Sequence, residues 1–389
     1  MDKIKLGIIG VGRMGTAHIE NILGGGSPDF EVVAVADIDP ARQAWAKKNI
    51  KDVAVFGDGM DLIDSGLVDA VMVEILHYDH PKYSIAAMQK GLHVICEKPA
   101  GVYTKQVREM NEVAEKSDVI FAMMFNQRTN PVYQKMRELV QSGVYGELRR
   151  VNWLITSWFR SQTYYEQGGW RATWKGEGGG TLINQCAHQL DLLQWICAMP
   201  EKVSAHMHLG KWHDIEVEDD VTAYMEFKNG ATGVFISSTG DEYGTNRFEI
   251  QLDGARIIAV EDHLEVLEYA EFASKHIYKD GNVASVPVEA KELELPDFGA
   301  VPNGHIEMLN NFGDAILGKG ELIAFGHEGI HGLELTNAMY LSSFLGKDVS
   351  FPIDEDVYYD ELMKRVATSR FEGIKPQDMD DCVLSNTTY

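Results

Sequence analysis

The sequence has few cysteines, no long run of apolar residues and, at its amino terminus, no apolar stretch of the kind expected in a signal peptide. Its four cysteines lack the closely spaced pairs of a zinc site, so we expect free thiols in a reducing compartment and no bound metal. No stretch approaches the roughly 20 apolar residues that a membrane-spanning helix needs. The amino terminus leads directly into a predicted strand, without the apolar segment of a signal peptide. We therefore expect a cytoplasmic protein that does not enter membranes.

Basic residues are also scarce. The chain has 35 Lys and Arg against 59 Asp and Glu, which gives a formal net charge of −24. This charge repels nucleic acid and anionic lipid, so we expect neither as a partner. The remaining composition is ordinary for a soluble globular protein, with 45% hydrophobic and 24% charged residues. A length of 389 residues is enough for about two to three domains.

A glycine-rich turn follows the first predicted strand, Ile4–Ile9, and leads into a helix that we expect to end near Leu23. The turn has the spacing G-x-G-x-x-G. In a dinucleotide-binding turn, the first glycine permits the bend, the second lets backbone approach a pyrophosphate, and the third lets helix pack on strand. The helix amino terminus then supplies N–H groups to the phosphates. We expect cofactor contacts from Gly10, Gly12, Arg13, Met14 and Gly15; the alternative is a glycine turn in an unrelated βαβ unit.

An acidic residue, Asp37, ends the second predicted strand, which spans residues 31–36. It lies about 20 residues after the glycine turn, where a carboxylate binds the adenosine ribose hydroxyls. A 2′-phosphate about 4 Å from this carboxylate would be repelled by roughly 4 kcal/mol per charge pair at an effective dielectric of about 20. The sequence therefore predicts NAD as the cofactor and makes NADP a poorer one, although Arg42 lies near enough to weaken the preference.

Strands and helices alternate through about residue 125. Further apolar runs predict strands at residues 53–56, 70–73, 92–95 and 119–124, with helical segments such as 81–90 between them. This alternation is typical of a doubly wound parallel sheet, so residues 1–125 are predicted to form a Rossmann domain of the α/β class. Two histidines, His77 and His80, lie between strand and helix. We expect them to line the crevice near the nicotinamide or to cap the helix, and not to form a metal pair.

Lys98 lies just after the strand at residues 92–95, in the segment Cys96-Glu97-Lys98-Pro99-Ala100-Gly101. The carboxyl ends of strands in open α/β sheets are where ligands bind. Pro99 keeps the local backbone out of a helix, so a rigid turn directs Lys98 toward the crevice. The following helix, from about residue 105 to 116, is predicted to be capped by Thr104. The alternative is a surface lysine in a turn.

The pattern changes after residue 125. Predicted strands at residues 148–156, 203–209, 221–227, 232–238, 248–252, 255–260 and 264–267 follow one another without intervening helices. We therefore predict a second, α+β domain at residues 126–345 with an open, mostly antiparallel sheet. Its late helices, near residues 305–317 and 328–345, can pack back on the Rossmann domain. Residues 346–389 form a polar, acidic extension for which the sequence predicts no fold.

Two stretches of the second domain suggest a binding site. The first is rich in aromatic residues and holds two arginines: Trp153, Trp158, Phe159, Arg160, Tyr164, Tyr165, Trp170, Arg171 and Trp174. Sugar rings pack on aromatic faces and their hydroxyls bind guanidinium groups. Alternatively, many of these aromatic residues belong to the core or to an interface.

The second stretch begins with three glycines, Gly178–Gly180, which we expect to end a loop and start a helix. Leu182, Cys186, Leu190, Leu193 and Cys197 form an apolar stripe on that helix. Asn184, His188 and Asp191 form a separate polar stripe. A single helical histidine is usually structural, but this stripe opens from a flexible glycine loop. We therefore predict a catalytic role for His188.

These motifs together resemble the glucose–fructose oxidoreductase / inositol dehydrogenase (Gfo/Idh/MocA) family over about the first 345 residues. The resemblance rests on the glycine turn, Asp37, Glu97-Lys98-Pro99, Trp170-Arg171 and the segment from Gly178 to His188. It implies a nicotinamide-dependent oxidation or reduction of a sugar or cyclitol hydroxyl. It also implies that Lys98 and His188 are the catalytic pair, with a cis Lys98–Pro99 bond. A homo-oligomer, dimer or tetramer, would form through the open sheet.

The resemblance completes the expected site. Cofactor contacts are expected from the glycine turn and Asp37, and further from His77, His80, Glu97, Lys98, Arg128, Trp170 and Arg171. Substrate contacts are expected from Lys98, Trp158, Arg160, Tyr164, Asn184, Gln185 and His188, and Asn184 joins Lys98 and His188 as a catalytic residue.

Two sites in the sequence, a tripeptide and a single residue, depart from the family pattern. Ile75-Leu76-His77 stands where relatives often have Thr-Pro-Asn, and Asn184 stands where they commonly have aspartate. An amide binds a hydroxyl but accepts no proton at neutral pH, so acid–base work falls on His188 with Lys98 assisting. At both sites the sequence resembles that of the family branch that acts on C3 of glucosides.

The sequence therefore predicts an NAD-dependent oxidoreductase that transfers hydride between a sugar, glycoside or cyclitol hydroxyl and nicotinamide. One alternative is an NAD-dependent glycosidase that oxidises C3 transiently, which acidifies the C2 proton so that the aglycone leaves. Another is a non-catalytic, dinucleotide-responsive regulator. Such a regulator would be expected to lose Lys98 and His188, and this chain has both.

Overall fold

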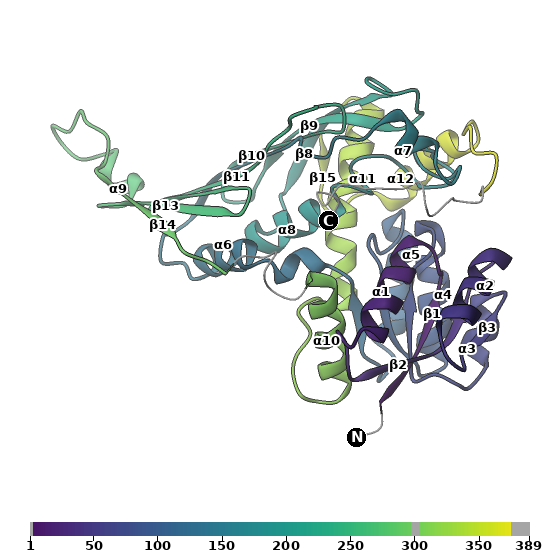
Figure 1. The fold of residues 1–389 in the computed structure, drawn as a ribbon. Coiled ribbons are helices and arrows are strands. Elements are labelled where there is room, and N and C mark those ends of the chain that lie inside the picture. The colour runs from purple at the N-terminus through teal and green to yellow at the C-terminus, as the bar shows by residue number, and fades with distance from the viewer. Residues whose placement is uncertain (1–2, 297–302, 375–389) are drawn as a thin grey trace.

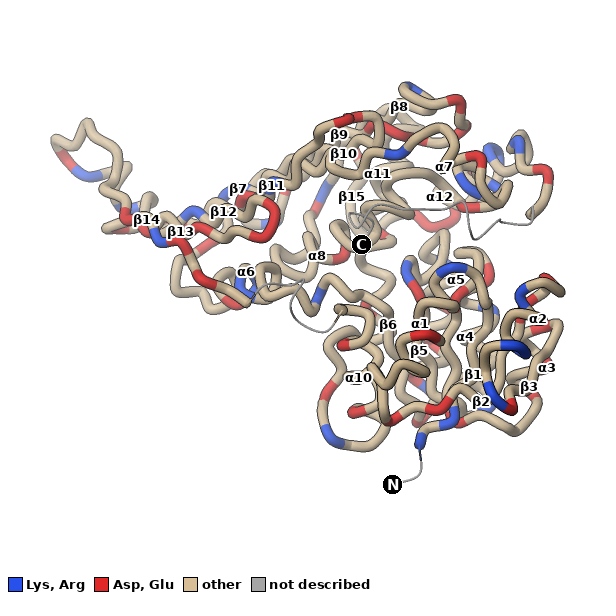
Figure 2. The backbone as a smooth tube through the Cα atoms, in the orientation of Figure 1, with Lys and Arg blue, Asp and Glu red and all other residues tan. Residues whose placement is uncertain are grey.

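A computed structural model of the chain describes residues 3–296 and 303–374. It shows a Rossmann domain beside a broad, extended sheet, with helices between them (Figure 1). Acidic and basic residues are spread over both parts, so the net charge is not confined to one face or tail (Figure 2). Within the described residues, no helix combines the length and apolar character that crossing a bilayer requires.

The first sheet is parallel and has the strand order β3-β2-β1-β4-β5-β6. Its strands are β1 (Ile4–Ile9), β2 (Phe30–Ala36), β3 (Ala54–Phe56), β4 (Ala70–Val73), β5 (His93–Cys96) and β6 (Phe121–Met123). The intervening helices are α1 (Arg13–Leu23), α2 (Pro40–Asn49), α3 (Gly59–Asp64), α4 (His80–Gln89) and α5 (Thr104–Ala114). The strand order reverses between β1 and β4, where a crevice forms at the carboxyl ends of the strands. The predicted doubly wound sheet is confirmed.

The second sheet has nine strands in the order β14-β13-β12-β11-β7-β10-β9-β8-β15. They are β7 (Leu148–Ile155), β8 (Lys202–Leu209), β9 (Glu218–Glu226), β10 (Thr232–Ser238), β11 (Asn246–Leu252), β12 (Ala255–Val260), β13 (His263–Tyr269), β14 (Val288–Leu293) and β15 (Val349–Ser350). Neighbours are antiparallel except β7 and β10, which run parallel. This confirms the predicted open, mostly antiparallel sheet.

Helices cover one face of this sheet. The helices of this part are α6 (Pro131–Gln141), α7 (Gln162–Glu166), α8 (Ala187–Cys197), α9 (Ala273–His276) and α11 (Gly329–Leu345). Helix α11 contacts both β8 and α8. Along β9, Val221, Ala223 and Met225 are buried, whereas Thr222 and Tyr224 between them are exposed. The described part of this chain therefore leaves the opposite face open.

The late helices join the two parts. Helix α10 (Gly304–Ile316) contacts α1 and the 3-10 turn η2 (Asn126–Thr129). Helix α11 contacts α5 as well as α8, so it touches both domains. The 3-10 turn η3 (Gly326–Glu328) precedes α11, and η1 (His77–Asp79) precedes α4. These contacts fix the position of the second sheet over the crevice of the first.

Several local expectations need correction. Tyr103 occupies the N-cap position of α5 without a side-chain hydrogen bond, so Thr104 is the first residue of the helix and not its cap. The helix expected to start at the glycine run starts at Ala187, after turns over residues 181–186. The carboxyl-terminal stretch, for which no fold was predicted, adds β15 to the sheet edge and forms α12 (Glu355–Val366), which packs on α5 and α11. Residues 375–389 of the expected extension, including Cys382, lie outside the described residues, and Cys96, Cys186 and Cys197 are free and buried.

Candidate active site

A cavity of about 380 Å³ lies between the two domains, at the carboxyl ends of β1, β2, β4 and β5. All but two of the predicted site residues line it: Gly10, Gly12, Arg13, Met14, Asp37, His77, His80, Glu97, Lys98, Trp158, Arg160, Tyr164, Trp170, Arg171, Asn184, Gln185 and His188. The two that do not are Gly15 and Arg128. Residues far apart in the sequence therefore meet at one site.

The glycine turn has the geometry of a dinucleotide cradle. Gly10 has φ +99°, and a Cβ there would lie 2.2 Å from the carbonyl oxygen of Glu74. A Cβ on Gly15 would lie 2.1 Å from the carbonyl oxygen of Gly10, so Gly15 lets α1 pack against the turn without itself reaching the cavity. Gly12 faces open space, with no atom within 4 Å of a built Cβ. The turn and the amino terminus of α1 thus leave room for a pyrophosphate.

Asp37 lies at the adenosine end of this cradle. Its carboxylate accepts hydrogen bonds from the backbone N–H groups of Val11, at 2.7 Å, and Asp39, at 2.8 Å. Arg42 is engaged elsewhere, because its guanidinium donates to the carbonyl of Val11 at 2.6 Å and to the hydroxyl of Thr16 at 2.5 Å. Arg42 therefore buttresses the glycine turn and does not line the cavity.

Removing the charge of Asp37 should change cofactor preference. In Asp37→Asn, we expect the ratio of kcat/KM for NADP to that for NAD to rise by about 10²–10³-fold, because repulsion of a 2′-phosphate is lost. Steady-state kinetics with both cofactors measures this ratio. Asp39→Asn is the matched control, since Asp39 caps α2 and does not line the cavity. An unchanged ratio in Asp37→Asn would show that this carboxylate does not select the cofactor.

Lys98 projects from the turn after β5 toward the second domain. The Lys98–Pro99 peptide bond is cis, as the resemblance implied. The side-chain Nζ donates to the carbonyl oxygen of Asn184 at 3.2 Å, and the backbone N–H donates to Glu97 Oε2 at 3.0 Å. Burial lowers the pKa of Lys98, against the opposing charges of Glu97 and Glu177. The amine is therefore easier to deprotonate than an exposed lysine.

His188 faces the same cavity from the first turn of α8. It is only 4% exposed, and neither ring nitrogen has a hydrogen-bond partner among the described residues. Its ring packs edge-on against Phe125, with centroids 6.3 Å apart. Burial, together with the nearby charge of Lys98, lowers the pKa of His188 well below its ordinary value. The imidazole is consequently neutral at pH 7 and has a lone pair available to a ligand.

Asn184 has an acidic partner that the sequence did not reveal. Its side-chain Nδ2 donates to Glu177 Oε1, and the other oxygen of Glu177 accepts from the N–H of Ala172 at 2.6 Å. Burial raises the pKa of Glu177, although Arg171 and these hydrogen bonds oppose the shift. The only sequence signal for Glu177 is its position directly before the glycine run.

Replacing Asn184 by aspartate, the residue that the resembled family commonly has there, should therefore destabilise the folded protein. Asn184→Asp loses a hydrogen bond to a charged acceptor and places a second carboxylate against Glu177, so we expect a loss of about 1.5–3 kcal/mol in the free energy of unfolding at pH 7. Denaturant unfolding measures it. In the double variant Asn184→Asp/Glu177→Gln, the amide at position 177 can donate to the carboxylate at position 184. This variant should therefore recover most of the lost free energy of unfolding. A single variant as stable as the parent would contradict the expectation.

Aromatic rings and guanidinium groups form the outer wall of the cavity. Tyr164 lies between two arginines, with Arg160 Cζ 5.0 Å and Arg171 Cζ 4.6 Å from its ring centroid. Its hydroxyl accepts from Arg171 at 3.0 Å and from Gln185 at 3.2 Å. Each arginine also lies over a tryptophan, Trp158 or Trp170. This wall offers flat apolar surfaces beside fixed hydrogen-bond donors.

The remaining aromatic residues of the stretch serve other purposes. Trp153 stacks on Phe248 in the core, with centroids 3.9 Å apart. Tyr165 and Trp174 are also buried, and Phe159 is exposed away from the cavity lining. The stretch thus divides between the cavity and the core.

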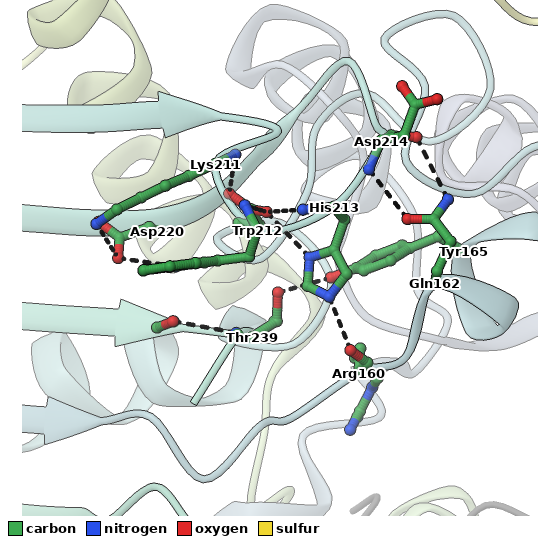
Figure 3. Close-up of polar contacts among 12 residues, drawn as sticks. Arg160, Gln162, Tyr165, Lys211, Trp212, His213, Asp214, Asp220 and Thr239 are labelled. Carbon is green, nitrogen blue, oxygen red and sulfur yellow. Dashed lines mark hydrogen bonds and ion pairs between the residues drawn. The ribbon is translucent and has the colours of Figure 1, made fainter. Parts of the chain in front are cut away.

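A polar network holds the backbone of Arg160 (Figure 3). The N–H of Arg160 donates to the carbonyl of Thr239 at 2.9 Å. Its own carbonyl lies 2.8 Å from His213 Nε2, and His213 Nδ1 lies 3.0 Å from a carboxylate oxygen of Asp219. Tyr165 donates to the hydroxyl of Thr239 at 2.8 Å. Arg160 is thereby anchored to the second sheet.

Arg128 was expected to contact the cofactor, but it forms a buried ion-pair cluster outside the cavity lining. It is fully buried, and its guanidinium makes a two-point contact with Asp191, at 2.8 and 2.7 Å, and a third contact with Glu328 at 2.5 Å. Asp191, the last member of the predicted polar stripe, is thus turned toward Arg128. This ion-pair cluster joins η2, α8 and η3, which directly precedes α11.

The two histidines near β4 support the Lys98 turn. The ring nitrogens of His80 lie 2.7 Å from the carbonyl of Pro99 and 2.9 Å from that of Ile75. His77 Nδ1 lies 3.0 Å from the carbonyl of Glu177, so it connects the two domains. Backbone carbonyls lie next to both ring nitrogens of His80 and next to Nδ1 of His77, which argues for a positioning role at the crevice.

Comparisons with known proteins agree with this architecture. Residues 4–125 match a family model described as "Oxidoreductase family, NAD-binding Rossmann fold", and residues 133–258 match one described as "GFO/IDH/MocA C-terminal domain". The chain is 28% identical over 289 residues to myo-inositol 2-dehydrogenase of Thermotoga maritima, covering 71% of this chain and 82% of that protein. It is 26% identical over 338 residues to D-glucoside 3-dehydrogenase of Escherichia coli, covering 82% and 90%.

Solved structures show the same fold. The WlbA dehydrogenase of Chromobacterium violaceum, in complex with NADH and UDP-GlcNAcA, superposes with a TM-score of 0.77 at 26% identity and covers 91% of this chain and 97% of its own. A levoglucosan dehydrogenase in complex with NADH gives a TM-score of 0.74 at 19% identity, covering 90% and 100%.

Proposed function

The chain belongs to the Gfo/Idh/MocA family of NAD-dependent oxidoreductases, and from that premise we propose that it oxidises a hydroxyl-bearing carbon of a sugar, glycoside or cyclitol. The observation that carries the proposal is that Lys98 and His188, from different domains, face one cavity beside the glycine turn. The aromatic and arginine wall supports a carbohydrate substrate, because it offers ring faces and donors together. The relative named D-glucoside 3-dehydrogenase makes glucosides the first substrates to test.

The cradle fits a bound NAD. The open side of Gly12 and the amino terminus of α1 would hold the pyrophosphate, and Asp37 would bind the adenosine ribose. When bound, NAD supplies the hydride acceptor. The residues of the chain supply orientation and proton transfer.

His188 acts as the general base in this proposal. Its unpartnered ring nitrogen takes the proton of the substrate hydroxyl, which a neutral imidazole can do at pH 7. Lys98 donates a hydrogen bond to the same oxygen as negative charge develops on it. Asn184 binds a neighbouring hydroxyl while its amide is held by Glu177. Arg160, Tyr164 and Gln185 orient the rest of the ring.

A substrate panel tests the proposal. The purified chain is incubated with NAD and with glucosides, hexoses, uronates and inositols, and formation of NADH is followed by absorbance. We expect turnover with one of these classes. Failure with every class would count against the proposed function. Free NADH accumulating with substrate would argue against a closed cycle of glycoside cleavage, in which the cofactor is reoxidised before it leaves.

We also propose a homo-oligomer, dimer or tetramer, formed through the open face of the second sheet. The exposed positions that alternate with buried ones along β9 support it. Light scattering of the purified protein measures the mass, and a monomer would overturn this assembly.

A further inference from the structure

Three buried side chains with unmatched polar atoms meet beneath the cavity. They are His18 in the middle of α1, Glu74 directly after β4, and Glu97 directly after β5. Their side chains are 2%, 1% and 9% exposed. Glu74 and Glu97 line the cavity floor, so the group can be reached from the cavity.

The atoms that face one another have no hydrogen-bond partners among the described residues. These atoms are His18 Nε2, both carboxylate oxygens of Glu74, and Glu97 Oε1. His18 Nε2 lies 3.8 Å from Glu74 Oε1 and 3.6 Å from Glu97 Oε1, which is within the range of an ion pair but too long for hydrogen bonds. Buried polar atoms are normally satisfied, and two buried carboxylates facing each other are unfavourable without a positive charge between them.

The separations suit a shared cation. One ligand atom from each residue lies within 4.8 Å of the others. Nitrogen and oxygen ligands about 2.0–2.2 Å from one tetrahedral metal centre are separated from each other by roughly 3.3–3.6 Å. The 3.6 Å from His18 to Glu97 falls within this range, and the 3.8 Å from His18 to Glu74 is slightly longer. One imidazole and two carboxylates form a donor set that suits divalent transition metals.

We propose that His18, Glu74 and Glu97 bind one divalent transition-metal cation of the Mn²⁺ or Zn²⁺ type. Three protein ligands leave a coordination position open toward the cavity. The ring of His305, which also lines the cavity, lies beside the site, with its centroid 5.5 Å from that of His18. The sequence predicted no metal, because the three ligands are separated by long stretches of chain and only the fold brings them together.

Metal binding by the full chain tests this inference. The protein is treated with a chelator, desalted and titrated with Mn²⁺, Zn²⁺ or Co²⁺, and bound metal is measured by calorimetry and elemental analysis. We expect one equivalent per chain, a rise in Tm on addition of metal, and a visible absorption band with Co²⁺. The Glu74→Gln and His18→Gln variants should each lose the bound equivalent and the rise in Tm.

A matched control addresses adventitious binding at the surface. His206 and His208 are exposed and alternate along β8, so they can chelate a metal without a built site. The double variant His206→Gln/His208→Gln should keep the single equivalent. The inference fails if the unmodified chain binds no stoichiometric metal, or if binding survives Glu74→Gln and His18→Gln. The measurement on the unmodified chain decides even where a variant does not fold.

Discussion

Lys98→Ala is expected to lower turnover by about 10²–10³-fold while NAD still binds, because the variant loses the donor that stabilises negative charge on the substrate oxygen. The side chain lies in the cavity, where Nζ is held by the carbonyl of Asn184, and contributes nothing to the glycine turn that would bind the cofactor. The loss should therefore appear in kcat, with the Kd for NAD nearly unchanged. Steady-state kinetics and a fluorescence titration with NAD separate the two.

A surface lysine provides the control for this variant. Lys90 forms an exposed ion pair with Asp64, so Lys90→Ala should have the turnover of the parent. Full activity in Lys98→Ala would remove this residue from the proposed chemistry. A large loss of NAD affinity would instead place Lys98 in cofactor binding.

His188→Gln is expected to lower kcat by about 10²–10⁴-fold, the usual contribution of a positioned general base. Glutamine keeps the polar character of the side chain but accepts no proton at neutral pH. His206→Gln, at an exposed site on β8, is the control and should have parental activity. Activity within a few-fold of the parent in His188→Gln would contradict the assignment.

The pH profile offers a second readout of His188. Protonation inactivates a general base, and the pKa of His188 lies well below its ordinary value because the ring is buried beside Lys98. In the parent, kcat/KM should therefore stay level as pH falls through about 6.5, the ordinary histidine pKa, and decline only at lower pH. The His188→Gln variant should lack this acid limb. A decline centred near 6.5 in the parent would mean that an exposed imidazole, and not His188, is the titrating base.

The parts of the site that depend on local spacing could be predicted from the sequence. The glycine turn, Asp37 and the Lys98 turn each lie at the end of a strand whose apolar run marks it clearly. In the fold, the carboxyl ends of these parallel strands lie at one edge of the sheet, which brings the three features together.

The parts that depend on distant partners could not be predicted. The helix expected at the glycine run starts late because the turns over residues 181–186 depart from helical spacing: the N–H of Cys186 donates to the carbonyl of Thr181, five residues back, at 2.8 Å. The distant carboxylate of Glu218 holds this segment by accepting from the N–H groups of Gly180 and Leu182, at 3.0 and 2.8 Å. Arg128 is drawn away from the cavity by Asp191 and Glu328. Strand β14 was missed because most of its residues are exposed, so its sequence lacks the alternation of a half-buried strand.

A structure of the chain with NAD and its sugar tests the central claim most directly. We expect Lys98 Nζ and one ring nitrogen of His188 to lie within about 3.2 Å of the same hydroxyl oxygen, on the carbon that faces the nicotinamide. If the two side chains instead contact different hydroxyls, or if only one of them reaches the sugar, the proposed pairing of Lys98 with His188 is wrong.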